Sequence, residues 1–94
     1  MMGRPEPAAN EGMLLSPCRS VHMYWMKYPL DVAFLAADGR VVATYHELAP
    51  SRRSKWHPDA ERALELRAGR LAETRTEVGD QLELRNEAER SDHG

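Results

Sequence analysis

The sequence lacks the features that would crosslink a fold or anchor it in a membrane. Cys18 is the single cysteine, so no intramolecular disulfide can form, and this composition fits a reducing compartment. No apolar run approaches the roughly 20 residues that a membrane span needs. The polar stretch 1–12 has no apolar segment of the kind found in signal peptides. We therefore expect a cytoplasmic protein with no membrane partner.

The sequence also has no large excess of charge of either sign. Its 13 lysine and arginine residues stand against 15 aspartate and glutamate residues, which gives a net charge of -2. Such a balance provides no global attraction to nucleic acid or anionic lipid, so any binding of that kind would need a local basic patch. The 94 residues suffice for one compact domain and are too few for two. We expect this domain over residues 12–84, between a flexible arm over 1–11 and a disordered charged tail over 85–94.

Short apolar runs separated by turn residues fill the middle of the chain. The runs expected to form strands are 13–15, 21–26, 31–35, 41–45, 63–66 and 81–84, and a short helix is expected over 70–76. This spacing predicts a mostly β (α+β) domain. We expect a small, partly closed β-barrel of five to six short antiparallel strands with one or two short helices.

The pair Asp38-Gly39 lies between two apolar runs and is the strongest hairpin signal in the sequence. A two-residue turn would place Asp31 opposite His46. A type I turn followed by a left-handed glycine in a bulge would place Asp31 opposite Tyr45. We favour the bulge, because Ala37 suits the second turn position and glycine suits the left-handed one.

Six short motifs follow one another in a distinctive order. They are Gly12-Met13-Leu14, Trp25-Met26-Lys27, Pro29-Leu30-Asp31, Asp38-Gly39, Leu64-Glu65-Leu66-x-x-Gly69 and Val78-Gly79-Asp80. Together they resemble domain-of-unknown-function family 192, a small prokaryotic family, over roughly residues 3–84. His22 preceded by Val21 resembles the shorter branch of that family. The resemblance implies a fold and does not imply a reaction.

The start of the chain, Met1-Met2-Gly3-Arg4, resembles the end of a segment that follows a β-strand in members of this family. The resemblance implies either a start codon further upstream or a missing first strand. A missing strand would leave unpaired backbone groups on its neighbour. We then expect a marginal, aggregation-prone domain or a dimer completed by strand exchange; otherwise we expect a monomer.

His22, Lys27 and Asp31 form the densest group of polar residues with potential chemistry. As a site, they would bind a ligand or exchange protons, with histidine titrating near neutrality and the aspartate orienting it. In the structural interpretation, Asp31 would cap or pin the turn after Pro29, and Lys27 would pair with Asp31 at the surface. His22 would then be an ordinary strand residue with its hydrogen bonds satisfied. Both interpretations are open from the sequence.

Two further kinds of site are disfavoured by geometry. Metal ligands could come from Cys18, His22, Met23 and Met26, but on a strand His22 and Met26 lie about 13 Å apart. A nucleophilic Cys18 would need a nearby base and a lowered pKa, and its neighbours match no protease spacing. We therefore expect no metal and no cofactor, and we assign no catalytic residue.

The polar segment 51–57 joins three cations to an indole: Arg52, Arg53, Lys55 and Trp56. These residues could bind a small anionic ligand or a protein partner, or could stack a base and neutralise phosphate in a nucleic acid. Alternatively, Trp56 could fold back onto the core as a lid.

We expect a non-catalytic binding or accessory module that recognises an anionic ligand or partner through this basic loop. The expected ligand-binding residues are His22, Lys27, Asp31, Arg52, Arg53 and Trp56. The alternative is a small enzyme that uses His22 and Asp31 on an anionic substrate, which requires both side chains in one cleft.

Overall fold

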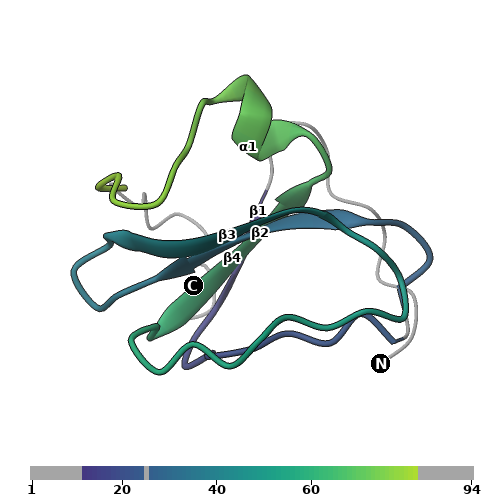
Figure 1. The fold of residues 1–94 in the computed structure, drawn as a ribbon, viewed down its shortest axis with the longest axis horizontal. Helices are drawn as coiled ribbons and strands as arrows, with labels where there is room; N and C mark the ends of the chain where they lie inside the picture. The colour runs from purple at the N-terminus through teal and green to yellow at the C-terminus, as the bar shows by residue number, and fades with distance from the viewer. Residues whose placement is uncertain (1–11, 25, 83–94) are drawn as a thin grey trace, which may run out of the picture.

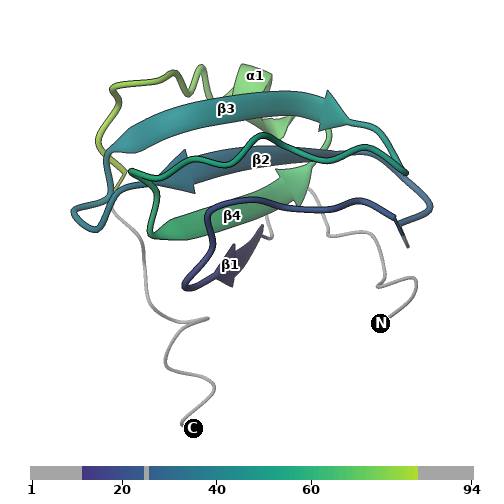
Figure 2. The ribbon, with the colours of Figure 1, turned by 60° about the horizontal axis from the view of Figure 1, so that its bottom comes forward.

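The part of the chain that the structure describes forms a four-stranded antiparallel sheet with one short helix (Figure 1). The computed structural model describes residues 12–24 and 26–82. Its elements are β1 (Gly12–Leu15), β2 (Leu30–Leu35), β3 (Val41–Leu48), β4 (Arg62–Arg67) and α1 (Arg70–Glu73). The strands lie in the order β1-β4-β2-β3, and every neighbouring pair is antiparallel (Figure 2).

The mostly β class and the short helix predicted from the sequence are therefore confirmed. The barrel is not, because the sheet formed by the described residues is open, with β1 and β3 at its two edges. The expected five to six strands are not confirmed either, since this part of the chain contains four. The expected arm over 1–11 and tail over 85–94 lie outside the described residues. No described helix has the length and apolarity needed to cross a membrane.

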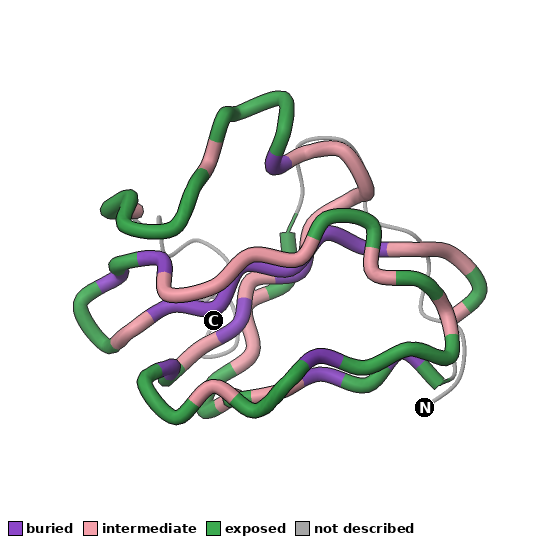
Figure 3. Tube along the Cα trace, viewed as in Figure 1, coloured by how far each residue is buried: buried purple, intermediate pink, exposed green. Residues whose placement is uncertain are grey.

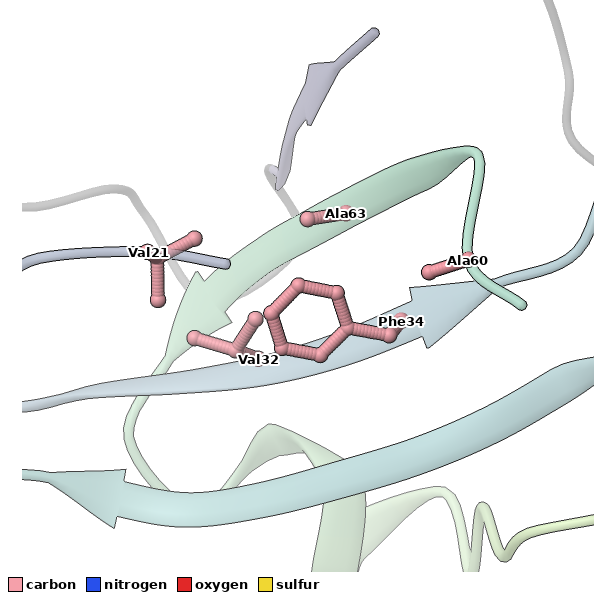
Figure 4. Close-up of a cluster of buried hydrophobic side chains, with 5 residues drawn as sticks. All are labelled: Val21, Val32, Phe34, Ala60 and Ala63. Carbon is pink, nitrogen blue, oxygen red and sulfur yellow. The ribbon is translucent and has the colours of Figure 1, made fainter. Parts of the chain in front are cut away.

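Strand β2 is buried along its whole length because both of its faces are covered. Side chains alternate between the two faces of a strand, and β2 accordingly contributes to two separate apolar clusters. One cluster consists of Val21, Val32, Phe34, Ala60 and Ala63 (Figure 4). The other consists of Ala33, Leu35, Val41 and Leu71, and Leu71 comes from α1.

Two long connections cover the face of the sheet opposite α1, and they run side by side in Figures 1 and 2. Residues 19–24 of the first connection pair with residues 51–57 of the second, and we call this pair the loop ribbon. Backbone N–H groups of Met23, Ser54 and His57 donate across it, to the carbonyl oxygens of Arg52 (2.7 Å), Val21 (3.0 Å) and Arg19 (2.8 Å). Of the strand expected over 21–26, residues 21–23 pair with the second connection outside the main sheet, with a bridge between His22 and Arg53, and residue 25 lies outside the described residues.

The hairpin turn between β2 and β3 has the predicted geometry. Gly39 is left-handed, at φ 92°, and its N–H donates to the Ala36 carbonyl at 2.9 Å. The predicted pairing of Asp31 with Tyr45 is nevertheless wrong, because Tyr45 lies opposite Val32. The register shifts by one residue just after the turn and again at Asp31. A bulge of this kind inserts an extra residue in one strand and displaces every pair beyond it.

Candidate functional site

The outer surface of the loop ribbon contains an open pocket of about 680 Å³. Its lining residues are Ser20, His22, Arg53, Ser54, Lys55 and Trp56. Two full cations, a histidine and an indole thus share one depression, and none of the described lining residues is a carboxylate. Such a surface is suited to binding a negatively charged group.

The ribbon positions these residues because its inner positions pack on the sheet. Val21 and Met23 are buried, whereas His22 between them is exposed, and Figure 3 shows buried and exposed positions interspersed along both connections. Buried Ser54 fastens the two segments together. Its hydroxyl accepts a hydrogen bond from the Val21 N–H at 3.0 Å and donates one to the Lys55 carbonyl at 2.8 Å.

Aromatic rings lie at the solvent-facing side of the ribbon. The rings of His22 and Tyr24 stack, with centroids 5.4 Å apart and an interplanar angle of 19°. Tyr24 is 53% exposed and Trp56 is 66% exposed. Trp56 therefore does not act as the lid on the core that the sequence left open.

A second aromatic pair supports the ribbon from beneath. The Tyr45 hydroxyl of β3 lies 2.8 Å from His57 Nε2 and accepts a hydrogen bond from the Lys55 N–H at 3.0 Å. The His57 ring also contacts Phe34, with centroids 4.7 Å apart. Burial, with a smaller contribution from the nearby Lys55 charge, lowers the pKa of His57. The sheet thus fixes the backbone position of a pocket cation.

Of the residues expected from the sequence, the structure brings His22, Arg53 and Trp56 together in one pocket. Arg52 is exposed on the ribbon beside them and does not line the pocket. Lys27 is exposed in the bend that follows the ribbon and also lies outside the lining.

Asp31 lies elsewhere, on the side of the sheet that carries α1. It is 0% exposed, and its carboxylate accepts three backbone hydrogen bonds. Oδ1 accepts from the Glu47 N–H at 2.8 Å, and Oδ2 accepts from the N–H groups of Gly69 at 3.1 Å and Leu71 at 2.8 Å. Since His22 belongs to the ribbon on the opposite face, the two residues do not share a cleft. The arrangement required by the enzyme alternative is therefore absent. The interpretation that paired Asp31 with Lys27 at the surface is wrong, because Asp31 is buried.

Cys18 is half-buried, and its thiol donates to the Ser20 carbonyl at 3.2 Å. Burial raises the pKa of the Cys18 thiol, and the charge of Glu65 raises it further. A raised pKa keeps the sulfur protonated, whereas a nucleophile needs the thiolate. Within the described ranges, no three His, Cys, Asp or Glu side chains are grouped so that they could hold a metal ion.

The sequence interpretation missed Ser20 and Tyr24, which flank His22 at two residues' distance on either side. In an extended segment, side chains two residues apart share a face. This alternation was the signal that could have placed Ser20 and Tyr24 beside His22.

The sheet, the short helix α1 and the loop ribbon define the chain as a small β-rich domain with a basic, aromatic surface on its connections. The family model for domain of unknown function 192 (DUF192), described as uncharacterized ACR, matches residues 1–84. The chain belongs to this family, as its short motifs predicted. No curated protein matches the chain.

Two solved structures share the fold. A protein of unknown function from Novosphingobium aromaticivorans DSM 12444 is 26% identical with a TM-score of 0.77, and the match covers 88% of this chain and 64% of that one. A protein from Sinorhizobium meliloti 1021, described as a proposed transcription regulator, is 28% identical with a TM-score of 0.74. That match covers 87% of this chain and 68% of the other. The chain thus spans 64% of the length of the first, less than two thirds.

Proposed function

We propose that this domain is a non-catalytic binding or accessory module of the cytoplasm that recognises an anionic ligand or partner through the loop ribbon. One observation carries the proposal: His22, Arg53, Lys55 and Trp56 line a single pocket that contains no described carboxylate. The whole chain has a net charge of -2, so this basic surface is a local feature of the ribbon.

The contacts around the pocket favour binding over catalysis. The Ser54 hydroxyl is engaged by two backbone groups, and the Cys18 thiol has a raised pKa. Asp31, which could have oriented His22, lies across the sheet. A regulatory role agrees with the description of the Sinorhizobium meliloti neighbour, and it forms part of this proposal.

The proposal is tested by titrating isotope-labelled protein with inorganic pyrophosphate and with a hexaglutamate peptide. We expect the backbone amide shifts to change at residues 20–24 and 52–56. Exposed ion pairs contribute about 0.2–1 kcal/mol each. The double variant Arg53→Gln/Lys55→Gln is therefore expected to weaken binding by about twofold to thirtyfold.

The matched control is Arg40→Gln/Arg75→Gln. It removes the same charge from two exposed residues outside the ribbon, at the hairpin tip and after α1. We expect this control to change affinity by less than twofold. Equal losses of affinity in both double variants, or amide shift changes spread over the whole protein surface, would show that binding depends on net charge. Either result would contradict a binding site on the ribbon.

A further inference from the structure

The ribbon presents aromatic surface that the core does not use. Trp56 and Tyr24 are the exposed tryptophan and tyrosine of the described residues, at 66% and 53%, and both belong to the ribbon. The His22 ring stacks on Tyr24 and extends that surface. Large rings held in water are suited to stacking against the flat face of a ligand.

The cations lie among these aromatic rings. His22 is the bridge partner of Arg53, which places the stacked His22 ring beside that cation. Lys55 and Trp56 follow Arg53 in the chain and line the same pocket as His22. The ribbon thus brings stacked rings, two cations and a second exposed ring together on one surface.

This combination of rings and cations points to one class of ligand. We propose that the loop ribbon binds single-stranded nucleic acid: bases stack on Trp56 and on the His22–Tyr24 pair, while phosphates contact Arg53 and Lys55. The inference rests on the proposed function and names its ligand. Binding modules for single strands combine a cationic track with aromatic stacking platforms, because every base has a stackable face.

Other anions explain less of the surface. An acidic peptide or a free phosphate would use the cations and would leave Trp56 and Tyr24 without a role. A duplex stacks its bases against each other and offers the ribbon phosphates alone. With a net charge of -2, the chain lacks the general attraction that would make duplex binding strong.

The test measures the fluorescence anisotropy of labelled ten-nucleotide oligomers, oligothymidine and oligouridine, over a range of salt concentrations. We expect both single strands to bind, with a duplex of equal length at least about tenfold weaker. Trp56→Ala is expected to weaken single-strand binding by about 5-fold to 150-fold while leaving the salt dependence unchanged. Arg53→Gln/Lys55→Gln is expected to reduce the slope of log K against log salt by about 1.4, at roughly 0.7 per phosphate contact.

Val78→Ala serves as the control for an exposed apolar side chain, since Val78 is 58% exposed and lies off the ribbon. It is expected to bind as the parent protein does, and thermal unfolding verifies that each variant is folded. If pyrophosphate and hexaglutamate bind through Arg53 and Lys55 while Trp56→Ala leaves oligonucleotide binding unchanged, the nucleic-acid inference fails and the anion site stands. If hexaglutamate binds more tightly than either single strand, the ligand is an acidic partner instead. If no probe depends on the two cations, both proposals fail.

Discussion

Replacement of Asp31 by asparagine tests whether this residue serves the fold. The carboxylate is fully buried and accepts one backbone N–H on Oδ1 and two on Oδ2. Asparagine has one carbonyl oxygen, which can still accept from Gly69 and Leu71. Its amide group would then face the Glu47 N–H, so one donor meets another donor and the Glu47 group loses its partner.

The expected loss of folding free energy follows from these three hydrogen bonds. Hydrogen bonds to a charged group contribute about 1.5–3 kcal/mol, neutral ones about 0.5–1.5 kcal/mol, and a buried unpaired donor costs about 1–3 kcal/mol. We therefore expect Asp31→Asn to lower the free energy of unfolding by about 3–5 kcal/mol. A domain of this length has a total stability of about 5–14 kcal/mol. The substitution thus removes a large share of it.

Urea unfolding followed by circular dichroism measures the effect. With an m-value of about 1.5 kcal/mol per molar, the midpoint is expected to fall by about 2–3 M. Asp38→Asn is the matched control, because the exposed Asp38 accepts a single N–H, from Arg40 at 3.0 Å, and water can replace that bond. We expect the control to lose less than about 1 kcal/mol. Equal midpoints for the two variants would refute the structural role of Asp31.

Two further predictions concern the turn and the acid response of the fold. Gly39 and Gly79 both have positive φ, at 92° and 98°, but a Cβ on Gly39 would lie 2.6 Å from the Leu82 carbonyl oxygen and one on Gly79 would meet nothing. Gly39→Ala is therefore expected to destabilise the protein by about 1–3 kcal/mol more than Gly79→Ala in thermal unfolding, and equal losses would contradict the close contact. Because the pKa of His57 is lowered in the fold, the unfolded chain binds that proton more readily, and stability is expected to fall as the pH drops from 7 toward 5. His57→Gln is expected to reduce this loss of stability at low pH, whereas His46→Gln, at an exposed site on β3, is expected to leave it unchanged. If stability depends on pH equally in both variants, other groups cause the acid response.

Local signals predicted the hairpin turn but not the register beyond it. Asp38-Gly39 determines the turn because a left-handed residue is needed there, and Gly39 supplies it. The apolar run Val41-Val42-Ala43 has no period-two alternation, so the sequence does not show which side chain faces which side. In the structure, Val41 joins the cluster on the α1 side, whereas Val42 and Ala43 pack on the other cluster. Packing from both faces decides the bulge, and that information is not local.

The candidate site shows the same division between local and distant information. The cations and indole of the segment 51–57 are visible in the sequence, and three predicted residues meet in the pocket. The partners of Asp31 are not visible, because its hydrogen-bond donors lie 16, 38 and 40 residues further along the chain. A buried carboxylate and a functional one look alike until those donors are placed.

In the proposed function, ligand binding to the loop ribbon would be linked to the local order of its two segments. His22 and Arg53 belong to different connections and are 31 positions apart in the sequence, yet they are β-bridge partners on one surface. A ligand that contacts both connections acts as a noncovalent crosslink, since releasing either segment dismantles its site. Local opening of the ribbon is then opposed by the binding free energy, about 2.7 kcal/mol at a free ligand concentration one hundred times the Kd. The two connections, which are joined to each other mainly by backbone hydrogen bonds, would thus become the most strongly ligand-protected part of the chain.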